Sequence, residues 1–156
     1  MRIPLIILIF IFISENVSAS GYIYYGSRVG MEVTVTSVSR LDTDSARITV
    51  KHTRQNARKF CTEYANDKSD TCIDNVLNEV HLNDEIYANC KTGKFLTLSG
   101  ETVIFAGRYK HPDEFSPKYR LILNGHELDA SSASGYSTFL GQYKALCPSS
   151  VLGGIE

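Results

Sequence analysis

The chain lacks an excess of charge of either sign. Its 156 residues carry 16 Lys and Arg against 17 Asp and Glu, which gives a formal net charge of −1 at pH 7. A protein that binds nucleic acid needs a clear surplus of basic residues to neutralise phosphates. The balance therefore argues against nucleic acid as the main partner, and against a strongly electrostatic role at a membrane surface.

Long apolar runs are also scarce, and the one clear example stands near the N-terminus. Residues 5–13 form an unbroken apolar run, and Arg2 precedes it. Val17 and Ala19 then occupy the −3 and −1 positions of a signal-peptide cleavage site. A helix as long as this run spans about 14 Å, whereas the hydrocarbon core of a bilayer is about 30 Å thick. We therefore expect residues 1–19 to be a signal peptide, with no stable membrane anchor left after cleavage.

Sequence typical of a linker is missing from the rest of the chain. There are only four prolines and no low-complexity tract. Residues 20–156 suffice for one domain with its own core. We expect a single domain over residues 20–148 and a flexible tail over residues 149–156, because Pro148 ends a helical pattern. The exported protein would be periplasmic or secreted.

Short motifs for nucleotide, calcium and acyl-transfer chemistry are missing as well. The segment ANCKTGKF has the Gly-Lys pair of a phosphate-binding loop, but Ala88 replaces the first glycine and Phe95 replaces the magnesium-binding Ser or Thr. The segment DTDSARITVKHT begins like a calcium loop but lacks the glycine and glutamate that such a loop needs. No Gly-x-Ser-x-Gly elbow occurs. We expect neither a metal nor a cofactor.

What the chain does contain is a regular succession of strand and helix patterns. Residues 31–39 and 46–52 alternate apolar and polar side chains with period two, and the segment RLDTDS turns the chain between them. Glu32 falls on the polar side of this alternation. The pattern predicts a β-hairpin.

A helical period follows the hairpin. Thr53 can cap a first helix, whose apolar side chains recur at the spacing of one helix face as far as Tyr64. The segment ANDKSD breaks this pattern, and Ser69 or Asp70 can cap a second helix that runs to about Val80. The middle of the chain is therefore predicted to be a helical hairpin.

The period of two returns after the helical hairpin. Residues 85–107 and 118–128 read as short strands, and Asn124-Gly125 is the signal of a type I′ turn between two of them. Residues 136–147 form a short amphipathic helix at the end. The predicted fold class is α+β: a mainly antiparallel sheet of hairpins with a helical hairpin and a short C-terminal helix.

All four cysteines, Cys61, Cys72, Cys90 and Cys147, lie after the predicted cleavage site. An even number in an oxidising compartment indicates two disulfides. Cys61 and Cys72 fall where the two ends of the helical hairpin meet, which favours their pairing and leaves the other two to pair. Four cysteines nevertheless allow three connectivities. No two are spaced like a pair of zinc ligands, and nothing marks one as a reactive thiol.

Two sets of side chains are candidates for binding. Tyr22, Tyr24 and Tyr25 crowd the start of the domain, and tyrosine suits interfaces because it brings large area at small entropic cost. Packing inward on the sheet is the alternative. Arg54 and Arg58 lie one helical turn apart near a helix N-terminus, where positive charge is unfavourable. They could grip an acidic partner, or simply face solvent.

At GSRVGMEVTV, KHTRQNARKFCTEY and SSASGYSTFLGQYKALCP the chain resembles small exported alphaproteobacterial proteins of unassigned function. The similarity spans nearly the whole mature region, including the cysteines. It implies a periplasmic or secreted setting and brings no catalytic residues with it.

We therefore expect an exported, disulfide-stabilised binding protein of the cell envelope that does not act as an enzyme. Its partner would be another envelope or extracellular protein. One alternative is a small secreted hydrolase that acts on glycan or cell-wall material through loop acids such as Asp113 and Glu127. Another is a structural subunit of an envelope assembly.

Overall fold

The computed structural model describes residues 21–110 and 117–152. This part of the chain forms one antiparallel sheet whose strands follow each other in sequence order, together with helices. The strands are β1 (Tyr22–Tyr24), β2 (Glu32–Ser39), β3 (Ala46–Lys51), β4 (Glu85–Asn89), β5 (Lys94–Leu96), β6 (Thr102–Arg108), β7 (Tyr119–Leu123) and β8 (His126–Glu127). The α-helices are α1 (Arg54–Glu63), α2 (Asp70–Glu79), α3 (Tyr136–Leu146) and α4 (Pro148–Leu152), and a 3-10 turn, η1, covers Ser132–Ser134. The predicted α+β class is confirmed.

Every strand pairs with its neighbour in sequence, so the sheet is a meander that the helical hairpin interrupts once, between β3 and β4. The turn between β7 and β8 shows how local sequence sets this topology. Asn124 and Gly125 have φ angles of 51° and 79°. A type I′ turn needs positive φ at both central residues, which Asn and Gly tolerate best. The predicted turn is confirmed.

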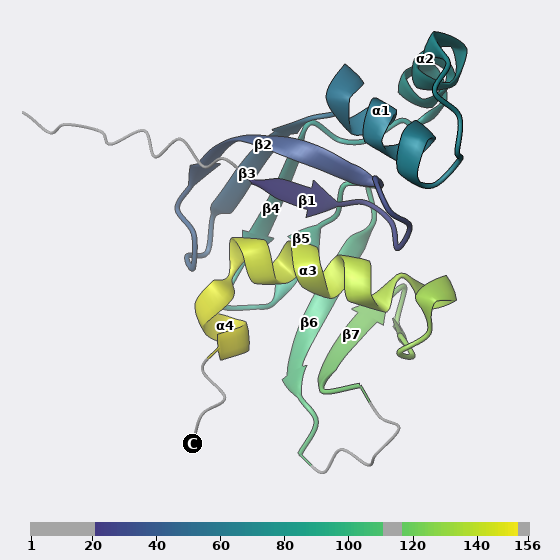
Figure 1. Cartoon of the computed structure of the whole chain (residues 1–156). Coiled ribbons are helices and arrows are strands. Elements are labelled where there is room, and N and C mark those ends of the chain that lie inside the picture. Colours follow the sequence, from purple (N-terminus) through teal and green to yellow (C-terminus); the bar gives the residue numbers. More distant parts are fainter. Residues whose placement is uncertain (1–20, 111–116, 153–156) are drawn as a thin grey trace, which may run out of the picture.

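The main core lies between the sheet and α3, which crosses one face of the sheet (Figure 1). Tyr143 of α3 is fully buried, with its ring centroid 4.4 Å from that of Phe105 and 5.1 Å from that of Phe95. Ile48 and Ile86 pair across β3 and β4 and point into the same core. The alternation of each strand thus sends one row of side chains toward α3 and the next row to the opposite face.

The helical hairpin stands beyond the β1–β2 side of the sheet and has a small core of its own (Figure 1). Thr53 caps α1, and its side chain accepts from the backbone N–H of Asn56. Asn56 in turn accepts from the Thr53 backbone, which completes a capping box. Ser69 caps α2 in the same way, accepting from the Cys72 N–H. The two predicted helices and their caps are confirmed.

Both predicted disulfides are present. Cys61 pairs with Cys72 and closes the helical hairpin, while Cys90 pairs with Cys147 and ties the end of β4 to the end of α3. No free cysteine remains. The second bridge joins residues 57 positions apart and therefore fixes α3 on the sheet covalently.

The flexible tail predicted from residue 149 is wrong as far as residue 152. α4 begins at Pro148, and proline suits the first position of a helix because that residue's N–H would be unbonded anyway. The Asp42 carboxylate caps the new helix by accepting from the N–H and hydroxyl of Ser149, at 2.8 and 2.9 Å. Tyr119 donates to the Val151 carbonyl at 2.8 Å. The predicted signal peptide lies outside the described residues.

Candidate binding surface

Tyr22 and Tyr24 lie on β1, the edge strand of the sheet. They are 51% and 53% exposed, while Ile23 between them points into the core. This is the alternation of a strand. Tyr25 differs from the other two: it is half-buried, and its ring packs edge-on against His52 at 5.4 Å. Burial raises the pKa of the Tyr25 hydroxyl. The structure therefore leaves two of the three predicted tyrosines available at the surface.

An ion pair between half-buried Lys59 and buried Glu32 lies beside these tyrosines. The Lys59 ammonium is 2.8 and 3.0 Å from the two carboxylate oxygens of Glu32, and 5.7 Å from the centre of the Tyr22 ring. Glu32 is only 1% exposed, so it is buried although it stands among the polar residues of the β2 alternation. The hydrogen bond to Glu32 raises the pKa of Lys59. Sequence periodicity missed this pair because α1 covers the start of β2 on the side that the alternation leaves to solvent.

The loop between β1 and β2 rests directly on α1. Gly30 has a φ angle of 80°, and a Cβ there would lie 2.4 Å from the backbone of Phe60. Only glycine fits this approach. The contact brings Arg28 over the ring of Tyr64, 4.9 Å from its centre, and leaves Val29 52% exposed.

These groups form one surface around a cavity of about 400 Å³. Tyr24, Arg28, Val29 and Lys59 line the cavity, and the first turn of α3 closes its far side. We define the aromatic–cationic surface as Tyr22, Tyr24, Arg28, Val29, Lys59 and Tyr64. Its tyrosines and valine are among the most exposed large apolar side chains of the described residues.

The predicted arginines have a different role. Arg54 forms ion pairs with Asp70 at 2.8 Å and with Asp74, both on α2. The hydrogen bond that Arg54 donates to Asp74 is the main reason that the pKa of Arg54 is raised. The acidic partner that the position of Arg54 suggested is therefore supplied by this chain itself. Arg58 is exposed and makes no ion pair with the described residues. The α1 residue that belongs to the aromatic–cationic surface is Lys59, which follows Arg58 in the sequence.

The structure describes only one of the two acids proposed for hydrolysis. Asp113 lies outside the described residues. Glu127 forms an ion pair with Arg120 at 3.0 Å, next to solvent. Within residues 21–110 and 117–152, no group of three or more His, Cys, Asp or Glu side chains is placed to hold a metal ion.

Comparison with known proteins adds no relative. The chain matches no protein-family model, no curated protein and no solved structure. Over the described part of the chain, none of the helices has the length and apolar character needed to cross a bilayer.

Proposed function

We propose that this chain is an exported, non-catalytic binding protein of the cell envelope, periplasmic or secreted, that docks a protein partner on the aromatic–cationic surface. Two disulfides support an oxidising compartment, where such bonds persist. Residues 1–19 have the charge, apolar run and small residues of a signal peptide.

The observation that carries the proposal is the clustering of half-exposed tyrosines with cations on rigid elements. Tyr22 and Tyr24 are on a strand, Tyr64 ends α1, and Arg28 lies over the Tyr64 ring. Tyrosine and arginine are the residues most enriched at the energetic centres of protein interfaces. A monomer that kept this area in water would leave a contiguous apolar patch exposed.

The charges of the surface favour an acidic partner. Glu32 is buried and bound to Lys59, so it neutralises that cation from below and presents no negative charge to solvent. Arg28, the other cation of the surface, lines the cavity. The Arg28 guanidinium already lies over the Tyr64 ring, so less side-chain entropy is lost when it binds a carboxylate of the partner.

Site-specific photocrosslinking in the cells that produce the protein tests the proposal. A benzoylphenylalanine at Tyr24 should give one discrete adduct, and the same group at exposed Lys144 on the last turn of α3 should give none. Arg28→Glu should abolish the adduct without changing the thermal melting of the protein. Equal adducts at both positions, or an adduct indifferent to Arg28→Glu, would contradict the proposed surface.

Export has its own test. The N-terminal residue of the protein recovered from the envelope or medium should be Ser20. Alkylation under denaturing conditions should label no cysteine before reduction and all four after it. A protein that retains residues 1–19 in the cytoplasm, or that has thiols labelled without reduction, would contradict the export proposal.

A further inference from the structure

The face of the sheet opposite α3 carries a second cavity, separate from the aromatic–cationic surface. The strand register aligns Arg47, Tyr87, Leu96 and Thr102 in one row across β3, β4, β5 and β6. Because their sequence neighbours Ile48, Ile86, Phe95 and Val103 point into the core, this row points away from α3. All four side chains of the row line a cavity of about 370 Å³.

Tyr87 supplies an aromatic wall to this cavity. It is 47% exposed, and the Arg47 guanidinium lies 6.0 Å from the ring centre, so the part of the ring that Arg47 leaves uncovered is available to a ligand. It pairs with Leu96 across the sheet, and Ile104, also on the outer face, is largely exposed as well. Stiff strands position these apolar groups, which limits the conformational entropy that binding would cost.

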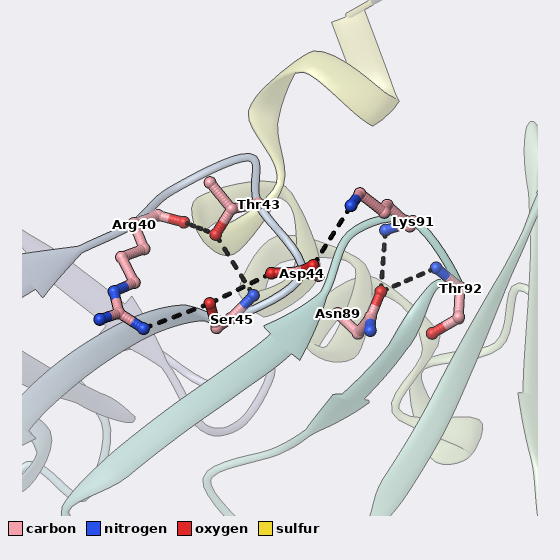
Figure 2. Close-up of polar contacts among 7 residues, drawn as sticks. All are labelled: Arg40, Thr43, Asp44, Ser45, Asn89, Lys91 and Thr92. Atoms are coloured by element: carbon pink, nitrogen blue, oxygen red, sulfur yellow. Dashed lines mark hydrogen bonds and ion pairs between the residues drawn. The ribbon is translucent and has the colours of Figure 1, made fainter.

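Short polar side chains also line the cavity, and Figure 2 shows the polar contacts among them. Asp44 and Ser45 come from the β2–β3 turn, Asn89 ends β4, and Thr92 comes from the β4–β5 turn beside it. The Asn89 side-chain oxygen accepts from the N–H groups of Lys91 and Thr92 at 3.1 and 3.0 Å, which fixes the amide plane. The amide nitrogen of Asn89 donates to no described residue and is available as a donor.

Two of the three charged side chains that line the cavity already have partners. Asp44 accepts from Lys91 at 3.2 Å, and Arg47 pairs with Glu85. Lys94 is the lining cation that makes no ion pair with the described residues. Apart from Lys94, a ligand here meets paired charges and a rim rich in neutral donors and acceptors, so the cavity can hold a ligand that carries no charge.

The backbone around the cavity is not available to a ligand. β3, β4 and β5 each have a hydrogen-bonded neighbour on both sides. An extended peptide usually binds by adding a strand to an open sheet edge. This cavity can offer side chains only, which disfavours a peptide.

We propose that this cavity binds a neutral saccharide unit. A pyranose has an apolar face of C–H groups, which fits against the ring of Tyr87, whose face carries partial negative charge. Its hydroxyls both donate and accept, which matches the acceptor Asp44, the donor Asn89 and the hydroxyl of Thr92. Few polar groups beside an apolar wall are the usual make-up of a small-molecule site. This glycan site is independent of the proposed protein partner.

The test is an NMR titration of the ¹⁵N-labelled mature protein, with both disulfides intact, against cellobiose and N,N′-diacetylchitobiose. At least one should shift the amides of Tyr87, Asn89 and Thr92, with a Kd of order 1 mM, as expected for a small exposed site. Tyr87→Ala should weaken binding by about tenfold, the effect of removing one aromatic contact. Tyr24→Ala, the same change at the other surface, should leave binding unaltered.

Asn89→Asp separates recognition from folding. It keeps the oxygen that accepts from Lys91 and Thr92 and removes the amide donor, so it should retain the fold and weaken saccharide binding severalfold. No shift with either disaccharide would overturn the proposal. Equal losses from Tyr24→Ala and Tyr87→Ala, or binding of an acidic hexapeptide rather than a saccharide at the same amides, would also overturn it. None of these outcomes bears on the photocrosslink at Tyr24.

Discussion

Replacing Gln142 by methionine should destabilise the protein through the loss of two hydrogen bonds, which join α3 to β1 and to the segment between β5 and β6. Gln142 of α3 is 1% exposed. Its side-chain oxygen accepts from the Leu98 N–H at 3.0 Å, and its amide nitrogen donates to the Tyr24 carbonyl at 2.8 Å. Methionine has nearly the same length and shape but offers neither bond, so the change tests the bonds rather than the packing.

The two lost bonds differ in cost. Leu98 is fully buried, so its N–H would lose its partner where water cannot replace it, at about 1–3 kcal/mol. Tyr24 is half exposed, so water can reach its carbonyl and only the net value of a hydrogen bond is lost, about 1 kcal/mol. Together the change should lower the free energy of unfolding by about 2–4 kcal/mol.

Urea unfolding followed by circular dichroism measures this difference. Gln55 of α1 is exposed and gives a matched control, since Gln55→Met makes the same chemical change without breaking a buried bond. The control should change the free energy of unfolding by less than about 0.5 kcal/mol. If Gln142→Met behaves like Gln55→Met, the bridging role assigned to Gln142 is wrong.

Two further predictions concern the disulfides and one histidine. Replacing Cys90 and Cys147 by alanine should lower the free energy of unfolding by about 4 kcal/mol, because this disulfide closes a loop of 57 residues. Replacing Cys61 and Cys72 should lower it by about 3 kcal/mol, because that loop has 11 residues. A lower urea midpoint for the second variant than for the first would refute this order. His52 has a buried Nε2 without a hydrogen-bond partner in the described residues, and burial lowers its pKa. The contribution of His52 to the free energy of unfolding should be constant above about pH 6.5 and fall as the pH drops below it, because His52 takes up its proton at a higher pH in the unfolded chain than in the folded one. If His52→Gln loses stability with falling pH as steeply as the unchanged protein does, the prediction is wrong.

Features that depend on neighbouring residues could be predicted from the sequence. The caps Thr53 and Ser69, and the positive-φ turn at Asn124-Gly125, are confirmed because each is decided within four residues. The Cys61–Cys72 disulfide followed in the same way, because a helical hairpin brings these two residues close whatever surrounds it.

Part of the candidate surface could also be found this way. Tyr22 and Tyr24 are exposed because a strand alternates its side chains, which the sequence shows. Lys59 and Arg28 carried no such signal. Each becomes part of the surface only where a distant element supplies its partner, Glu32 for the lysine and the Tyr64 ring for the arginine.

The sequence by itself therefore determined the period of each segment, the hairpins and caps, and the class of the fold. Only the tertiary structure decided which charges are buried and which partners they have. Glu32 reads as a surface residue until α1 folds over β2, and Arg54 reads as free until α2 brings Asp70 beside it. The reason is physical: periodicity is set by backbone geometry over a few residues, whereas desolvation and ion pairing depend on groups brought together from far along the chain.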